Sequence, residues 1–370
     1  MLSGTRADQL VILDIEDCLG DFNGTGRVGY YALADWVSAC HHCGIDANVV
    51  VGEANYFRPD HPLGWRRELI SDDGTVRRFK RIIPSPLRPL EVHYRDTDCE
   101  KYAMTKPALE TEADYEALLG YLRLLRENRM ELVRSFRRMR EEVGEGGLLT
   151  VFVPAPMEMY YVILQQEMVY HWLDFEETYR RAMQEVEQTG LFIIDCAAEA
   201  GADMIMFGGA GTEIFSPEMI EAGIIQPETR YAEKCRELGM FSLMHCCGCT
   251  QILLDRGWID AVRPTVFESF TQKPLGNIED PSAAARGLPH GTFFKGGLSL
   301  AQLRNGTPSE VSAMTRAALS GFGGVPFILA GTCAVLTGTP AENLKAVSGT
   351  VQELSGGCGR GYFTRQGNNG

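Results

Sequence analysis

Several features that would place the 370-residue chain in a membrane, secreted or nucleic-acid-binding class are missing from it. No apolar run approaches the roughly 20 residues that a membrane-spanning helix needs. No basic segment followed by an apolar stretch and a small-residue cleavage site opens the chain, as in a signal peptide. Basic residues are not in excess: the formal charge is −14, whereas a phosphate-binding surface needs a basic face. We therefore expect a cytoplasmic protein without a nucleic-acid or membrane partner.

Low-complexity tracts are also missing, and no dinucleotide-binding G-x-G-x-x-G motif follows the first strand-like run. The composition, 45% hydrophobic and 23% charged, is that of a globular protein with a full core. Cysteine, in contrast, is abundant. Eleven cysteines are many for a chain without an export signal, and in a reducing compartment cysteines stay as thiols or bind metal rather than pair.

Strand-like and helix-like segments alternate along most of the chain. Helix starts are marked by a hydroxyl residue followed by proline at Ser216, Thr307 and Thr339. About eight strand–helix units predict a TIM (β/α)8 barrel, an α/β fold that we prefer to a doubly wound open sheet. The strand-like runs are Leu10–Asp14, Ile45–Val51, Leu149–Val153, Met204–Phe207, Phe241–Met244, Ala261–Arg263, Thr292–Lys295 and Phe327–Leu329.

Short alternating pieces interrupt this rhythm between about residues 60 and 100. There, Asp73-Gly74 lies in a turn between the strand-like runs Arg67–Ser71 and Val76–Ile83. We interpret this segment as an N-terminal β-hairpin elaboration, inserted near the mouth of the barrel. Residues 1–370 are then expected to form a single barrel domain.

Metal-ligand side chains gather where two of the strand-like runs end. His245 and Cys247 follow the fifth run, and Cys333 follows the eighth. The carboxyl ends of barrel strands converge on one mouth, and zinc favours imidazole and thiolate ligands, with three protein ligands leaving a fourth position open. We therefore predict a zinc site made by His245, Cys247 and Cys333, although a histidine and cysteines at a strand end can also be packing residues.

Other cysteines compete for the same role. Cys246 should point away from His245, because side chains alternate along a strand, whereas Cys249 remains an alternative to Cys247. The stretch from Cys40 to Cys43 also resembles a metal-binding pair. It lies on a predicted helix and lacks a second pair at zinc-finger spacing, which counts against it.

The sequence resembles the uroporphyrinogen decarboxylase superfamily, and within it the corrinoid-dependent methyltransferases. The resemblance covers roughly residues 100–355, and His245, Cys247 and Cys333 match the His-x-Cys pair and later Cys of the methyltransferase branch. The motifs that carry it are Lys106–Leu118, Ala200–Ile205 leading to Phe215–Met219, Met244–Gly248, Gly296–Gly297 with Arg304–Pro308, and Gly331–Cys333 with Thr339–Asn343.

This resemblance implies a TIM barrel and a zinc-dependent transfer of a methyl group between a small methylated molecule, such as a methoxylated aromatic or a thiol, and a corrinoid (cobalamin). The hairpin favours demethylation of the substrate. The chain contains no D-x-H-x-x-G cobalamin-binding motif, so the corrinoid is expected on a partner protein or free in solution; a homodimer is a further possibility. The alternatives are a decarboxylase that acts on a porphyrinogen-like acid and a non-catalytic module that binds a corrinoid protein.

Polar residues after other strands supply further candidates. We expect Glu213 to be a reserve zinc ligand or a general acid, with a solvated loop carboxylate as the alternative, and Glu158 and Tyr160 to take part in catalysis, with simple packing as the alternative. Further pocket or site candidates, for each of which simple packing is the alternative, are Glu53, Asn55 and Tyr56 at a cofactor-binding position, Met157 and Tyr161 in the pocket wall, and Glu268, Lys295 and His93 elsewhere.

Overall fold

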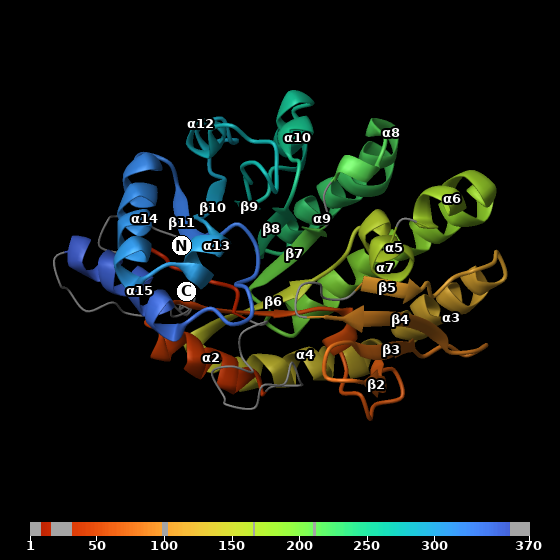
Figure 1. Cartoon of the computed structure of the whole chain (residues 1–370). Coiled ribbons are helices and arrows are strands. Elements are labelled where there is room, and N and C mark those ends of the chain that lie inside the picture. The colour runs from red at the N-terminus through yellow and green to blue at the C-terminus, as the bar shows by residue number, and fades with distance from the viewer. Residues whose placement is uncertain (1–8, 16–31, 98–102, 166, 210–211, 356–370) are drawn as a thin grey trace, which may run out of the picture.

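The computed structural model describes residues 9–15, 32–97, 103–165, 167–209 and 212–355. A curled sheet of seven parallel strands organises them, with its helices outside the curve (Figure 1). From β6 onward each strand pairs with the next one along the chain, as successive strand–helix units require. In sheet order the strands are β1 (Ala47–Val51), β6 (Gly147–Phe152), β7 (Met204–Gly209), β8 (Phe241–Cys246), β9 (Val266–Glu268), β10 (Phe293–Leu298) and β11 (Phe327–Gly331).

The extended segment around Val11 lies between the two edges of this sheet. Val11 forms a parallel bridge with Leu329 of β11, and the Ile12 amide donates to the Leu329 carbonyl at 3.0 Å. On its other side, the Asp46 amide, directly before β1, donates to the Val11 carbonyl at 2.8 Å. The segment therefore brings Asp14 to the edge of the sheet at which β11 ends.

Helices cover the convex side of the sheet, and their bounds follow the sequence signals in most places. Ser216 and Thr307 accept hydrogen bonds from Met219 and Glu310 amides as predicted N-caps. The helices are α2 (Leu33–His42), α3 (Asp114–Glu127), α4 (Arg129–Val143), α5 (Pro156–Leu164), α6 (Glu167–Asp174), α7 (Glu176–Glu199), α8 (Pro217–Ile220), α9 (Gln226–Glu237), α10 (Gln251–Asp255), α11 (Trp258–Val262), α12 (Pro281–Arg286), α13 (Leu300–Asn305), α14 (Pro308–Gly321) and α15 (Ala341–Leu354). Single turns of other helix types are η3 (Glu53–Asn55), η4 (Gly144–Gly146), η5 (Thr212–Ile214) and η6 (Glu221–Ile225).

Two hydrophobic clusters hold the sheet from its two sides. The larger one joins strand residues to the helices. The smaller one consists of residues from the strands and from the Val11 segment, so it fills the concave side. This division follows from the alternation of side chains along each strand. The buried members of the smaller cluster are Ile12, Leu148, Met204, Leu243, Val266 and Ile328.

The predicted hairpin is part of a second, four-stranded antiparallel sheet. Its strands are β2 (Arg66–Asp72), β3 (Arg77–Ile83), β4 (Leu90–Asp96) and β5 (Ala103–Lys106). One face is buried through residues such as Phe79 and Tyr94, whereas β2 is exposed along its whole length. The sheet lies beside α3 at one end of the molecule (Figure 1).

Two sequence predictions about elements were wrong. Residues Ala261 and Val262 belong to helix α11, and the strand of this unit is β9, a few residues later. Short apolar runs do not distinguish helix from strand, and here the β-branched and aromatic Val266-Phe267 pair forms the strand. Thr339 does not cap α15: the N-cap residue is Pro340, and the Thr339 hydroxyl donates instead to the Leu336 carbonyl at 2.7 Å.

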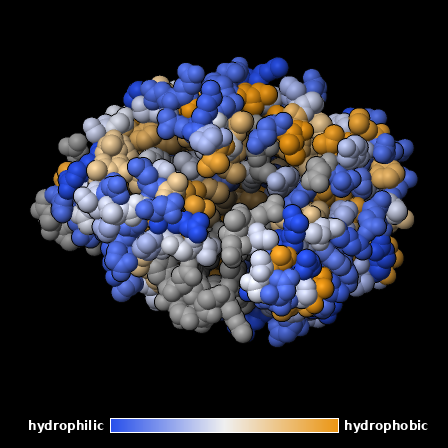
Figure 2. All heavy atoms as spheres, viewed as in Figure 1, coloured by the Kyte–Doolittle hydropathy of each residue, from blue (hydrophilic) through white to orange (hydrophobic). Residues whose placement is uncertain are grey.

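The surface of the described residues is mostly hydrophilic on the face in Figure 2, which is hollowed near the middle of the view. None of the helices that the structure describes is long and apolar enough to cross a membrane.

Candidate metal centre

His245, Cys247 and Cys333 come together at one edge of the curled sheet. Each offers one ligand atom, and these three atoms all lie within 4.8 Å of one another. The Cys333 Sγ lies 4.0 Å from the His245 Nε2. Among the residues that the structure describes, this is the one group of three or more histidine, cysteine or acidic side chains with metal-binding spacing.

The strand order explains why residues so distant in sequence meet. His245 lies near the carboxyl end of β8 and Cys247 directly follows that strand, while Cys333 is two residues beyond β11. The carboxyl ends of parallel strands in a curled sheet converge on the same opening. Between His245 and Cys247, the Cys246 side chain is buried on the opposite side of the strand, as alternation along β8 requires.

A glycine permits the close approach of the neighbouring strand to His245. Gly208 of β7 adopts a φ of +97°, and a Cβ there would lie 1.8 Å from the His245 carbonyl oxygen. Beyond it, the Cys247 thiol lies 3.6 Å from the Gly209 carbonyl oxygen and can donate to it. The backbone of β7 therefore forms one wall of the cluster, and any residue larger than glycine at position 208 would displace His245.

The three ligand side chains perturb one another electrostatically. A hydrogen bond with Cys333 lowers the pKa of the Cys247 thiol, although burial opposes this shift. That same hydrogen bond, together with burial, raises the pKa of Cys333. Burial alone would lower the pKa of His245, but hydrogen bonds to Cys333 and Glu268 raise it to about 10. The ligands of zinc are thiolates and neutral imidazoles, so a zinc ion would have to displace protons from His245 and Cys333, whereas the pKa of Cys247 is already shifted towards the thiolate.

A buried charged network lies behind His245. Its Nδ1 is 3.3 Å from the Glu268 Oε2, and the Glu268 Oε1 accepts from the Lys295 Nζ at 3.0 Å. Lys295 also donates to the Asp14 Oδ2 at 2.5 Å. Burial alone would raise the pKa of Glu268, but the Lys295 and His245 charges and hydrogen bonds lower it to about 2. The carboxylate is therefore ionised throughout the usual pH range.

The expected catalytic residues lie elsewhere. Glu213 is exposed in the single turn η5 and is not part of the cluster. Glu158 is buried, and its Oε2 accepts from the Ala155 amide at 2.7 Å and from the Gly208 amide at 3.1 Å. It therefore caps α5 and fixes the end of β7. Tyr160 is buried in the core, where its hydroxyl donates to the Tyr179 carbonyl at 3.2 Å.

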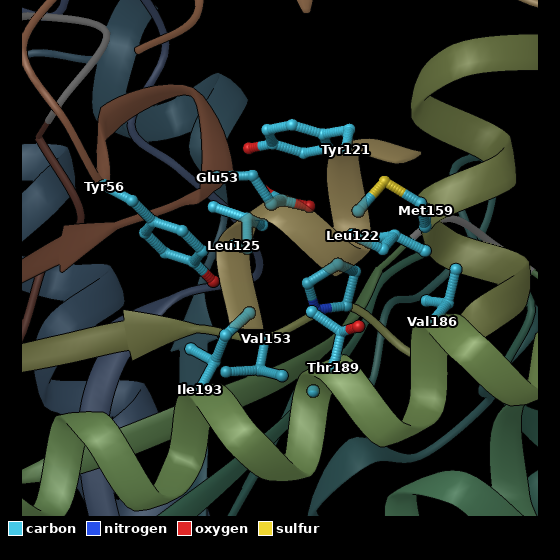
Figure 3. A pocket seen from close by; sticks show the side chains of 12 residues that line it. Glu53, Tyr56, Tyr121, Leu122, Leu125, Val153, Met159, Val186, Thr189 and Ile193 are labelled. Atoms are coloured by element: carbon cyan, nitrogen blue, oxygen red, sulfur yellow. The ribbon is translucent and has the colours of Figure 1, made fainter. Parts of the chain in front are cut away.

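Glu53 and Tyr56 line a small apolar cavity between α3 and α7, which Figure 3 shows from close by. The Glu53 carboxyl points into it, and its Oε1 is buried without a hydrogen-bond partner. Burial is the main cause that raises the pKa of Glu53 to about 7. Asn55 is exposed and does not line the cavity. The lining residues include none of the three ligand candidates, so this cavity is distinct from the metal cluster.

The remaining histidine and cysteine candidates have structural contacts of their own. His41 bonds to the Gly146 carbonyl at 2.8 Å and His42 to Lys345 at 3.0 Å, so the stretch from Cys40 to Cys43 forms no metal group in the described structure. His93 lies on β4 beside Glu91 at 3.3 Å. Cys249 is also outside the cluster.

Sequence reasoning gave too little weight to Lys295 and did not single out Asp14. A signal was present for both. A lysine in the otherwise apolar run Thr292-Phe-Phe-Lys295 implies a buried cation, which needs an acidic partner. Asp14 ends the apolar run that begins at Leu10, so it is the acidic residue at the end of the first strand-like segment.

Fold and cluster together define the class: an α/β protein with a thiolate–imidazole candidate metal centre at the carboxyl edge of a curled parallel sheet. The sequence model of the uroporphyrinogen decarboxylase (URO-D) family matches residues 89–354, which is more than half of the chain. The chain therefore belongs to the URO-D family, as the resemblance of its motifs indicated. No curated protein sequence matches it.

Solved structures support the same fold. A methyltransferase from Methanosarcina mazei superposes with a TM-score of 0.63 at 17% identity, covering 94% of each chain. A B12-independent methionine synthase from Shewanella sp. W3-18-1, in complex with selenomethionine, has a TM-score of 0.46 at 14% identity and covers 94% of this chain and 96% of its own. At these identities the first likeness shows the fold, and the second is too distant to support an argument.

Proposed function

We propose that the protein is a zinc-dependent methyltransferase, which moves a methyl group between a small methylated substrate and the cobalt of a corrinoid carried by a partner protein. The observation that carries the proposal is the convergence of His245, Cys247 and Cys333 within 4.8 Å. In the same proposal the curled sheet is a closed (β/α)8 barrel whose eighth strand is the Val11 segment. The hydrogen bonds of that segment to Leu329 and to Asp46 support closure.

The donor set fits zinc better than other common metals. Two thiols and one imidazole are soft and borderline ligands, whereas magnesium and calcium take oxygen. Three protein ligands with a fourth position open are typical of catalytic zinc, and sealed structural sites use four. When bound, a zinc ion would supply Lewis acidity, which polarises an ether oxygen or lowers the pKa of a thiol.

The chain's own residues would hold and shape this centre. His245 presents Nε2 on the side of Cys333, while the Glu268 carboxylate lies against Nδ1 and can accept a hydrogen bond from Nδ1–H. That contact favours the tautomer whose free lone pair is on Nε2. The glycines at the end of β7 bring backbone rather than bulky side chains to the cluster, since a Cβ at Gly208 would lie 1.8 Å from the His245 carbonyl oxygen.

The substrate class follows from the centre and the elaborated N-terminal half. An O-methyl compound, such as a methoxylated aromatic, or a thiol would place its reacting oxygen or sulfur at the open position. Because the chain lacks a D-x-H-x-x-G motif, we place the corrinoid on a partner protein, with free corrinoid as the alternative. We favour demethylation of the substrate, with the methyl group passing from the substrate to the corrinoid, since the second sheet enlarges one end of the fold.

Decarboxylation is the second candidate, and the name of the matching family favours it. A decarboxylase of this kind releases carbon dioxide without zinc or corrinoid. A protein that only binds a corrinoid protein would do neither. The three functions therefore differ in metal content, in the methylation of cobalt and in carbon dioxide release.

Metal content is the first test. We expect about one zinc per chain in the purified protein and loss of zinc in Cys333→Ser, since one of three ligands is removed. Cys249→Ser is the matched control, because Cys249 is a nearby, half-buried cysteine outside the cluster. A zinc-free wild type, or unchanged zinc in Cys333→Ser, would refute the site.

The reaction is tested next with the same proteins. Wild type is mixed with a panel of methyl donors and cobalt(I) corrinoid, free or on a corrinoid protein, and cobalt methylation is followed by absorbance. We expect methylation with wild type and Cys249→Ser and not with Cys333→Ser. Carbon dioxide release from a porphyrinogen-like acid without corrinoid would favour the decarboxylase instead. Binding of a corrinoid protein without turnover of any donor would favour the binding module.

A further inference from the structure

We infer that Asp14 and Lys295 are positioning residues of the metal centre: Asp14 anchors Lys295, and Lys295 holds Glu268 so that its second oxygen faces His245. The inference rests on the proposed metal centre, but not on which reaction takes place there. It adds to the three candidate ligands two residues that form no hydrogen bond or ion pair with them among the described contacts.

A continuous line of close contacts connects Asp14 to His245. Lys295 Nζ lies 2.5 Å from the Asp14 Oδ2 and 3.0 Å from the Glu268 Oε1. The other carboxylate oxygen of Glu268, Oε2, lies 3.3 Å from the His245 Nδ1. Neither Oε2 nor Nδ1 has another hydrogen-bond partner in the described structure. The two buried polar atoms are thus left to each other, and Lys295 occupies the oxygen that would otherwise compete.

The sheet places these residues at the same height on neighbouring strands. His245 of β8 pairs in register with Glu268 of β9. Lys295 is one residue beyond Phe294 of β10, which pairs with Phe267, so it stands beside Glu268. Asp14 lies three residues beyond Val11, which bridges to β11. From β10, the long Lys295 side chain therefore contacts Glu268 on the neighbouring strand β9 and Asp14 in the segment beside β11.

Burying these charged side chains costs free energy, which indicates a role other than stability. Lys295 and Glu268 are each 1% exposed, and Asp14 and His245 are each 8% exposed. Removing ions from water costs several kcal/mol each, and apolar side chains of similar volume often replace buried ion pairs without loss of stability. Lys295 pairs with Ile328, a member of the apolar cluster on the concave side. An apolar residue would therefore suit position 295 on packing grounds, whereas only a cation can neutralise both acids.

The consequence concerns the tautomer and orientation of His245. A carboxylate that accepts a hydrogen bond from Nδ1–H holds the proton on Nδ1, which keeps the Nε2 lone pair free on the side of Cys333 and makes the imidazole a stronger ligand. Without Lys295, Glu268 would lose the cation that lies 3.0 Å from its Oε1, and its carboxyl group would be free to turn away from His245. This change weakens its contact with His245, so the effect of Lys295 on the metal passes through Glu268.

Cobalt(II) binding to the metal-free full-length chain tests this, because the thiolate charge-transfer and ligand-field bands report both affinity and ligand geometry. We expect Glu268→Gln and Lys295→Met to weaken cobalt(II) binding about 10- to 100-fold, the usual effect of losing such supporting contacts, and to shift the ligand-field bands. Asp14→Asn keeps the size of the side chain. It should change the cobalt(II) affinity and the ligand-field bands in the same direction as Lys295→Met, and it remains informative if Lys295→Met does not fold. Lys106→Met, an exposed lysine on β5, is the matched control and should bind as wild type.

The double variant separates positioning from general destabilisation. If Lys295 acts through Glu268, the double variant Lys295→Met/Glu268→Gln binds cobalt(II) no more weakly than Glu268→Gln alone. Wild-type affinity and spectra in both Lys295→Met and Asp14→Asn would overturn the inference, and so would losses that multiply in the double variant. Failure of wild type itself to bind cobalt(II) or zinc would instead refute the metal centre of the proposed function.

Discussion

Replacement of Glu53 by glutamine should change the stability of the protein in a pH-dependent way. The Glu53 carboxyl points into the apolar cavity between α3 and α7 (Figure 3), and its Oε1 has no hydrogen-bond partner. Burial disfavours the charged form and, although Arg81 opposes the shift, raises the pKa of Glu53 from 4.5 to about 7. Because the folded pKa is the higher one, folding is favoured at low pH, and this stability is lost as pH rises through about 7.

The size of the effect follows from the shift. A pKa that rises from 4.5 to about 7 corresponds to about 3.4 kcal/mol in total, of which about 2.5 kcal/mol is lost between pH 5 and pH 8. Glutamine has nearly the same shape and no charge, so Glu53→Gln should lack this loss. At pH 5 the variant and wild type should unfold similarly, and at pH 8 the variant should be more stable by up to about 2.5 kcal/mol. For a chain of this length, that is about 3 °C in Tm.

Thermal and urea unfolding at pH 5 and pH 8, with the metal content held equal, measure this difference. Glu141→Gln, an exposed glutamate on α4, is the control and should leave the stability unchanged at both pH values. A stability difference between Glu53→Gln and wild type that is the same at pH 5 and pH 8 would refute the reasoning, because it would mean that Glu53 does not change its charge over this interval.

Two further substitutions test local features of the fold by urea unfolding. Thr307→Ala removes the hydroxyl that accepts from the Glu310 amide at the start of α14, keeps the bond from the residue-307 amide to the Glu310 carboxylate, and should cost about 1 kcal/mol; Ser309→Ala in the same turn should cost less, and equal losses would contradict the capping role. Gly208→Ala would place a Cβ 1.8 Å from the His245 carbonyl oxygen and should destabilise the fold by several kcal/mol, as large steric changes in a packed interior do. Gly74→Ala, also at positive φ but with no atom within 4 Å, should cost only about 1 kcal/mol, so similar losses at the two glycines would contradict the close approach of β7 to β8.

Sequence reasoning was most successful where a pattern had one physical interpretation. The alternation of apolar strands and capped helices predicted the parallel sheet, and the Asp73-Gly74 turn predicted the hairpin. It failed for the strand placed at Ala261–Arg263, because an apolar run of three residues suits a helix equally well. The prediction that Thr339 is the N-cap of α15 failed for a similar reason. A hydroxyl residue before proline can also donate to a carbonyl in the turn that precedes it, as Thr339 does.

In the candidate site, the sequence predicted the positions of residues better than the directions of their side chains. Strand-end positions brought His245, Cys247 and Cys333 together as expected, because the carboxyl ends of parallel strands meet whatever the loops do. Side-chain direction is set by packing, which the sequence does not display. Glu158 therefore caps a helix rather than reaching the cluster, and Glu53 and Tyr56 point into a cavity between helices.

The distribution of polar side chains over the sheet has a consequence for the proposed function. His245, Glu268, Lys295 and Cys333 come from or directly follow four successive strands, β8 to β11, and Asp14 comes from the segment beside β11. On the other half of the sheet, β7 ends in the glycines at positions 208 and 209, and β1 and β6 lead to the apolar cavity of Glu53. If a methyl group is transferred at the cluster, the reacting atom has to lie over the charged half. The rest of the substrate then extends over the half with glycines and apolar side chains, so we expect substitutions after β1, β6 and β7 to change which methyl donor is accepted and those after β8 to β11 to abolish the reaction.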